Sequence, residues 1–97
     1  MFNQVFIVGK IDKIPDLNCK NMENILVLEV KRNYKNVEGV FDKDYFSCYL
    51  WSALCKKINV SCKIGDVIAL RGRLINDREK SACNILAEQV ILLNKAM

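Results

Sequence analysis

Apolar and polar side chains alternate along most of this chain with a period of two, which is typical of half-buried β-strands. Leu26 and Leu28, for example, fall on one face of their segment, while Glu29 and Lys31 fall on the other. In the same way, Ile68, Leu70 and Leu74 are expected to point inward. Segments of this kind, rich in Val, Ile and aromatic residues, predict five strands, at 2–11, 24–33, 45–51, 66–75 and 82–93. The polar stretch at 18–23 predicts a loop, and the polar stretch at 33–44 predicts an exposed connection between two antiparallel strands.

A helical spacing interrupts these strands after residue 51. Apolar side chains recur at helical intervals at four positions: Leu54, Cys55, Ile58 and Cys62. Ser52 is a suitable N-cap for this helix and Gly65 a suitable stop. The sequence therefore predicts one short helix between the third and fourth strands.

The order of three strands, one helix and two strands excludes the alternating β and α elements of a parallel, doubly wound sheet. It is the layout of an OB-fold, so the expected fold class is all-β, a five-stranded Greek-key barrel with one short helix between strands 3 and 4. Gly9 and Gly72 interrupt their strands: Gly9 predicts a bulge or a bend and Gly72 a bulge, which would help a small sheet to curve. With 97 residues, the chain 1–97 is expected to form a single domain.

The third strand, YFSCYLW at 45–51, carries aromatic rings on the face that should be polar. Phe46, Cys48 and Leu50 share the face expected to point inward. Tyr45, Tyr49 and Trp51 share the other with Ser47. Exposed rings on a strand either stack on a ligand or pack in a subunit interface, and the pattern alone leaves the two readings even.

Composition narrows the classes of function only slightly. The chain is 52% hydrophobic and 27% charged, which is typical of a globular protein, and its net charge of +4 is compatible with a polyanionic partner. No apolar run reaches the length of a membrane span and no signal peptide is recognisable, so we expect a cytoplasmic protein with no membrane partner. The five cysteines lack close pairs and there is no histidine, so the sequence predicts buried free thiols and no metal site.

Several segments in register resemble bacterial single-stranded DNA-binding proteins, the SSB family. They are Met1, Asn3, Val5 and IVGK at 7–10, PDL at 15–17, DYFSCYLW at 44–51, KIGD at 63–66, RGRL at 71–74 and AEQV at 87–90. The resemblance covers nearly the whole chain, in the family's order and close to its spacing. It implies an OB-fold whose exposed aromatic rings stack on bases.

The resemblance implies three stacking residues, Tyr34, Tyr45 and Trp51. Simple alternation would turn Tyr34 inward, so its exposure requires a bulge or a strand that has already ended. A further aromatic position of the family corresponds here to Glu79, in a loop without a ring. Tyr49 matches no stacking position and is interpreted as a packing or interface residue.

Cations beside these rings are interpreted as phosphate contacts. They are Lys10, Lys31, Arg32, Lys35, Lys43, Arg71 and Arg73. Alternating cations and rings are what a groove that follows a nucleic-acid backbone needs. Asp42 and Asp44 are expected to moderate the charge of Lys43, and Lys56 and Lys57 on the helix are expected to be merely solvated.

The expected function is therefore binding of single-stranded DNA with little sequence specificity, in replication, recombination or repair. Alternatives are a primosome-type OB-fold adaptor that acts mainly through protein contacts and an oligomerisation barrel without nucleic acid. The sequence has no catalytic motif, so neither an enzyme nor a cofactor is expected. The resemblance implies a homo-oligomer, a tetramer or failing that a dimer. Because the chain stops after its last strand, recruitment of repair enzymes through an acidic tail is not expected.

Overall fold

The computed structural model describes residues 1–15, 24–79 and 81–95. The elements follow the order β1 (Val5–Lys13), β2 (Ile25–Lys35), β3 (Phe41–Tyr49), α1 (Ser52–Ser61), β4 (Val67–Asp77) and β5 (Ala82–Asn94). The predicted order of three strands, one helix and two strands is confirmed. The predicted loop at 18–23, with Cys19, and the segment 16–17 of the SSB-like opening lie outside the described residues, as does Lys80.

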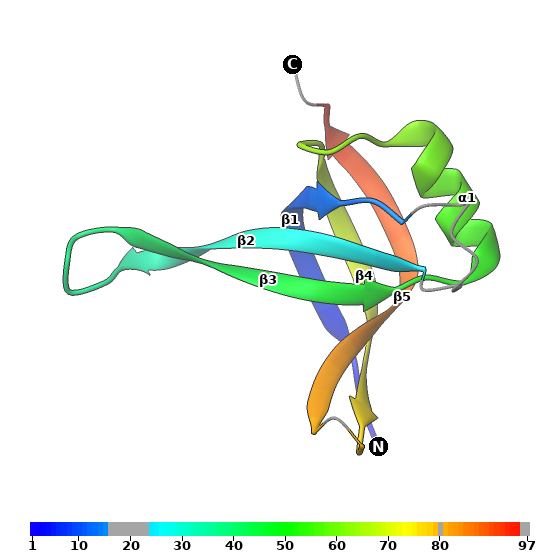
Figure 1. Cartoon of the computed structure of the whole chain (residues 1–97), viewed down its shortest axis with the longest axis horizontal. Coiled ribbons are helices and arrows are strands. Elements are labelled where there is room, and N and C mark those ends of the chain that lie inside the picture. The colour runs from blue at the N-terminus through cyan, green and yellow to red at the C-terminus, as the bar shows by residue number, and fades with distance from the viewer. Residues whose placement is uncertain (16–23, 80, 96–97) are drawn as a thin grey trace.

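The strands form a closed ring in the order β1-β2-β3-β5-β4 (Figure 1). All neighbours are antiparallel except β3 and β5, which run parallel over two residue pairs, Cys48 with Ile85 and Tyr49 with Leu86. This Greek-key connectivity is that of the predicted OB-fold barrel.

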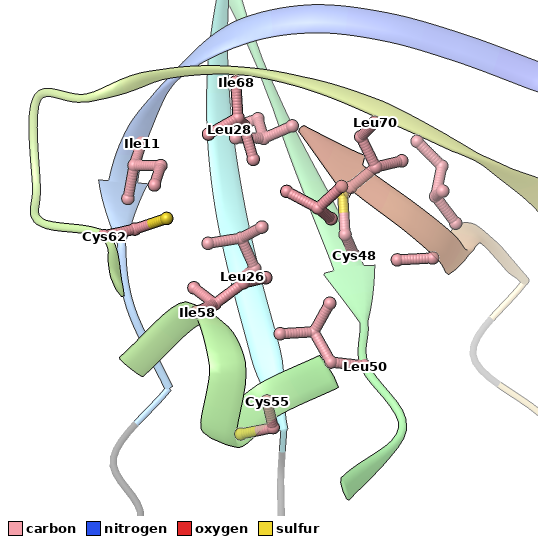
Figure 2. Packing of buried hydrophobic residues seen from close by; sticks show 13 residues of the cluster. Ile11, Leu26, Leu28, Cys48, Leu50, Cys55, Ile58, Cys62, Ile68 and Leu70 are labelled. Carbon is pink, nitrogen blue, oxygen red and sulfur yellow. The ribbon is translucent and has the colours of Figure 1, made fainter. Parts of the chain in front are cut away.

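The core fills the ring and is covered from one side by α1. Cys55 and Ile58 of the helix point into the same cluster as Leu26 and Leu28 of β2 (Figure 2). The other members of the cluster are Ile11, Cys48, Leu50, Cys62, Ile68, Leu70, Ile85, Ala87 and Val90. The inward positions that alternation predicted at Leu26, Leu28, Cys48, Leu50, Ile68 and Leu70 are confirmed.

Two predicted inward positions are wrong. Phe46 is 36% exposed and Leu74 is also exposed, although both continue the alternation of their buried neighbours. They line a groove that also includes Ile85, and no residue of α1 lines it. Alternation assigns a side chain to a face of the sheet, but that face is buried only where another element covers it.

Gly72 allows β4 and β5 to approach closely. A Cβ atom there would collide with the carbonyl oxygen of Leu86, and the register between the two strands shifts between Arg71 and Gly72. The predicted bulge at Gly9 is wrong, because β1 pairs with β4 without interruption there. Gly9 is needed for a close crossing instead, since a Cβ atom would lie 2.9 Å from the carbonyl oxygen of Glu29.

The four cysteines within the described residues follow the sequence prediction with one exception. Cys48, Cys55 and Cys62 are buried free thiols, and burial raises the pKa of the Cys48 thiol to about 12. The prediction is wrong for Cys83, which is a free thiol on the surface of β5. In the described part of the chain, no helix is long and apolar enough to cross a membrane.

Candidate functional site

A long β2–β3 hairpin extends beyond the ring of strands (Figure 1). β2 continues to Lys35 and β3 begins at Phe41, so the predicted connection at 33–44 shrinks to a turn at 36–40. The side-chain oxygen of Asn36 accepts hydrogen bonds from the backbone N–H groups of Glu38 (2.9 Å) and Val40 (3.1 Å). These bonds order the turn from within.

The strand pairing of this hairpin is interrupted around Tyr34. Lys31 pairs with Lys43 and Lys35 pairs with Phe41, so three residues of β2, 32–34, lie opposite Asp42 alone. This is the kind of irregularity that the exposure of Tyr34 was expected to require. Tyr34 is 64% exposed.

The other two rings of interest are also exposed. Tyr45 is 56% exposed and pairs across the hairpin with Glu29, whose carboxylate accepts a hydrogen bond from the Tyr45 hydroxyl at 3.3 Å. Trp51 is 65% exposed and lies at the entrance to α1. None of the three rings belongs to the core cluster.

Trp51 occupies an unusual position for its residue type. The prediction of Ser52 as N-cap is wrong, because Trp51 is the N-cap and makes no capping hydrogen bond through its side chain. Serine, threonine, aspartate and asparagine are preferred at this position because their oxygens satisfy free N–H groups of the first turn. A large exposed ring here serves neither the helix nor the core, which favours a role in binding.

A groove of about 710 Å³ runs between the hairpin and β1, and we call it the hairpin groove. It brings Tyr34 together with three of the predicted cations, Lys10, Lys31 and Arg32. Tyr45 lies instead in the groove of about 480 Å³ that Phe46 and Leu74 line. The predicted site residues are thus distributed over more than one surface of the barrel.

Arg32 is held by two carboxylates. Its Nε and Nη2 atoms donate to Asp44 at 3.0 and 2.9 Å, and its Nη1 atom lies 3.7 Å from Asp42. The hydrogen bonds from Arg32 lower the pKa of the Asp44 carboxyl below its ordinary value. The expectation that Asp42 and Asp44 moderate Lys43 is therefore wrong: both contact Arg32.

Two further predicted cations form ion pairs on the surface. Lys43 lies 3.2 Å from the Glu29 carboxylate, and Arg73 lies 3.0 Å from that of Glu88. The hydrogen bond from Lys43 lowers the pKa of Glu29. Exposed pairs of this kind are weak, so they leave the cations able to exchange a carboxylate for another anion.

Lys31 and Lys35 lie against a ring that sequence reasoning missed. Their ammonium groups are 4.8 and 5.7 Å from the centre of the Phe41 ring. Phe41 is half-buried at the start of β3. The feature that could have identified Phe41 is its pairing with Lys35 directly across the hairpin. This pairing can be deduced only once the register shift at the bulge is known.

The remaining predicted cation, Arg71, lies away from the rings. It pairs with Phe6 across β1 and β4, on the side of the sheet that faces away from the core. Phe6, Val8, Ala69 and Ile91 line a shallow groove of about 180 Å³ on that side. We call these four residues, with Arg71 and Gln89 beside them, the outer sheet face.

Comparison with known proteins identifies the family. No protein-family model matches the chain. The chain is 34% identical over 77 residues to single-stranded DNA-binding protein B of Bacillus subtilis. The aligned region covers 76% of this chain and 68% of that protein. It is 29% identical over 77 residues to single-stranded DNA-binding protein 1 of Streptococcus pyogenes, again over 76% of this chain but only 59% of that relative.

The fold also matches solved structures. The Plasmodium falciparum SSB in complex with single-stranded DNA superposes with a TM-score of 0.72 at 15% identity, over 97% of this chain and 96% of that one. This similarity confirms the OB-fold. Together with the identity to the B. subtilis protein, it shows that the chain belongs to the single-stranded DNA-binding protein family.

Proposed function

We propose that this protein binds single-stranded DNA with little sequence specificity, stacking bases on Tyr34, Tyr45 and Trp51. The observation that carries the proposal is the exposure of these three rings outside a core that is complete without them. Every base has an aromatic face, so stacking tolerates any sequence and contributes about 1–3 kcal/mol per base. Membership of the family supports the choice of ligand.

The phosphates are held by cations near the rings. Lys10 and Lys31 share the hairpin groove with Tyr34, and Lys35 follows it directly in the chain. Among the described residues, no carboxylate lies within ion-pair distance of these three lysines. Lys43 and Arg73 contribute by exchanging Glu29 and Glu88 for phosphate, and Arg71 contributes from the margin of the outer sheet face. Each phosphate neutralised releases counterions, which makes the affinity depend on salt.

We also propose that the chain assembles into a homo-oligomer, a tetramer or failing that a dimer, through the outer sheet face. Phe6 and Val8 of β1 and Ile91 of β5 are exposed there, on the two strands that flank β4. A continuous exposed apolar patch of this kind is typical of an interaction surface. Arg71 at its margin fits a polar rim around an apolar centre.

The biological role that fits such a protein is protection of single strands in replication, recombination or repair, in the cytoplasm. The protein acts by binding, not by catalysis. Nothing in the comparisons supports the alternative of an adaptor that acts mainly through protein contacts.

Titration with oligo(dT) at low salt tests the binding. Bases that stack on Trp51, the single tryptophan, will quench its fluorescence. The logarithm of the binding constant will fall with that of the salt concentration by about 0.7 per phosphate neutralised. Lys10→Ala will flatten this slope by about one phosphate's worth, whereas Lys56→Ala, an exposed lysine on α1, will leave it unchanged. Unchanged fluorescence and no mobility shift at micromolar protein would reject the function.

A further inference from the structure

A relay of polar side chains runs along the outer half of the β2–β3 hairpin. Asp44 on β3 accepts hydrogen bonds from the Nε and Nη2 atoms of Arg32, and the Nη1 atom of Arg32 faces Asp42. The other oxygen of Asp42 accepts a hydrogen bond from the Asn36 side-chain amide at 3.0 Å. Asn36 in turn holds the backbone of the turn at 36–40. The relay therefore joins β3 to the tip of the hairpin.

The relay lies where the strand pairing of the hairpin is interrupted. Between the pair Lys31–Lys43 and the pair Lys35–Phe41, three residues of β2 face a single residue of β3. Regular ladder hydrogen bonds cannot form across such a bulge. The side chains of Arg32 and Asp42, which both lie in the irregular stretch, bridge this gap. Tyr34 lies in the same stretch, so its position depends on whatever fixes the bulge.

We propose that Arg32 is a positioning residue: held by Asp44 and Asp42, it fixes the bulge and so presents Tyr34 to the bases, and it is not itself a phosphate contact. The inference rests on the proposed function and changes the role of one residue within it. Tyr34 and Arg32 line the same groove, so loss of the relay would alter the shape of that groove directly.

The geometry at Arg32 favours positioning over phosphate binding. A guanidinium recognises a carboxylate or a phosphate best through two parallel hydrogen bonds, and Asp44 already occupies this edge of Arg32. A phosphate would have to displace this bidentate carboxylate or approach the remaining edge of the guanidinium, where the Asp42 carboxylate lies 3.7 Å from Nη1 and would repel it. Lys10 and Lys31 lie in the same groove, and among the described residues no carboxylate forms an ion pair with them that a phosphate would have to displace.

Asp44→Asn separates the two roles, because they predict changes of opposite sign. If Arg32 contacts phosphate, removal of its competitor and of one negative charge will tighten binding to oligo(dT). If Arg32 positions Tyr34, the variant will bind about fivefold or more weakly, because part of the stacking on one ring is lost. Glu38→Gln removes a charge from the same hairpin outside the relay and will not weaken binding. Tighter binding by Asp44→Asn would overturn the inference.

Arg32→Lys provides a second, independent comparison. Lysine keeps the charge but cannot form the two-pronged contact with Asp44. Under the positioning role it will weaken binding as Arg32→Ala does, and both variants will keep the salt slope of the native protein. Native affinity in Arg32→Lys, or a slope reduced by about 0.7 in Arg32→Ala, would mean that Arg32 contacts phosphate.

Coupling to the ring completes the test. In a Tyr34→Ala background, Asp44→Asn will have little further effect on binding, since the ring that the relay positions is already absent. Full additivity would contradict the inference. Without DNA, hydrogen exchange at the amides of Glu38 and Val40 will accelerate in Asp44→Asn while the core strands stay protected. This last measurement reports on the relay even if the native protein fails to bind DNA, so the two proposals fail separately.

Discussion

The backbone carbonyl of Trp51 accepts a hydrogen bond from the Cys55 amide, with an N···O distance of 2.8 Å, and so begins α1 at a residue that is 65% exposed. The helix thus uses the backbone of Trp51 and not its side chain. Leu50, directly before it, is buried in the core and anchors this backbone. A rigid backbone that carries a solvent-exposed ring is a suitable platform for stacking.

Trp51→Ser will separate binding from folding. Serine restores the hydroxyl that the N-cap lacks, so thermal stability will be maintained or will rise by about 0.5–2 kcal/mol. Loss of the ring will weaken binding to oligo(dT) by about 1–3 kcal/mol. Calorimetry and a competition titration measure the two effects; a large loss of stability would show that the ring packs in the native protein.

Leu28→Ala is the matched control in the core. Leu28 is fully buried, so its truncation will destabilise the fold by about 2–5 kcal/mol, while the folded fraction keeps its affinity. Phe46, on the same face of the sheet as Cys48, is a poorer control because it is partly exposed.

Gly72→Ala will destabilise the protein although it adds only one methyl group. The methyl would meet the carbonyl oxygen of Leu86, a backbone atom that cannot rotate away. Overpacking of this kind costs about 1–3 kcal/mol, and here the strands β4 and β5 must separate to relieve it. Urea denaturation checks the loss. An unchanged midpoint would mean that the two strands shift apart freely.

Phe6→Lys will dissociate the proposed oligomer. The new lysine lies directly across from Arg71, so association would desolvate a second cation beside the first, which is unfavourable. Sedimentation equilibrium will report a shift toward monomer at tens of micromolar. Val60→Lys, at an exposed apolar position on α1, is the control and will leave assembly unchanged. A native protein that is already monomeric at this concentration would reject the proposed assembly.

The Asp44–Arg32 pair gives the hairpin a dependence on acid pH. The pKa of Asp44 is lowered in the folded protein, so the pair contributes stability above the unfolded value of about 3.9 and loses it as the pH falls through the folded pKa. Carboxyl chemical shifts will show a midpoint for Asp44 below that of an ordinary aspartate. In Arg32→Ala the midpoint will return to the ordinary range, and an unchanged midpoint would exclude Arg32 as the cause.

The element order and most of the core could be predicted from sequence because alternation is a local property. Leu26, Leu28, Ile68 and Leu70 lie inside as their spacing indicates. Alternation does not reveal which parts of a strand another element covers. For this reason it misplaced Leu74 and Phe46, and residue type alone misplaced Cys83.

The partners of the charged residues could not be predicted because they depend on the register across the hairpin. The offset between the strands places Tyr45 opposite Glu29 and Lys43 opposite Lys31, so Lys43 lies diagonally across from Glu29. Arg32, the first residue past the regular pairing, reaches back to Asp44. Charge and spacing along the sequence contain no signal for that offset. The roles of the rings and cations remain predictions that the binding experiments above test.

The parallel seam between β3 and β5 has a consequence for how fast this protein folds. It joins Cys48 to Ile85 and Tyr49 to Leu86, and β1 joins β4 through residues still further apart in the sequence. The chain must lose the conformational entropy of these long loops before the contacts between the strands can stabilise it. This slows folding to a timescale on the order of milliseconds to seconds. Stopped-flow refolding will measure this rate. During that interval the apolar strand β1 lacks its partner, so a newly made chain is most vulnerable to aggregation before its ring closes.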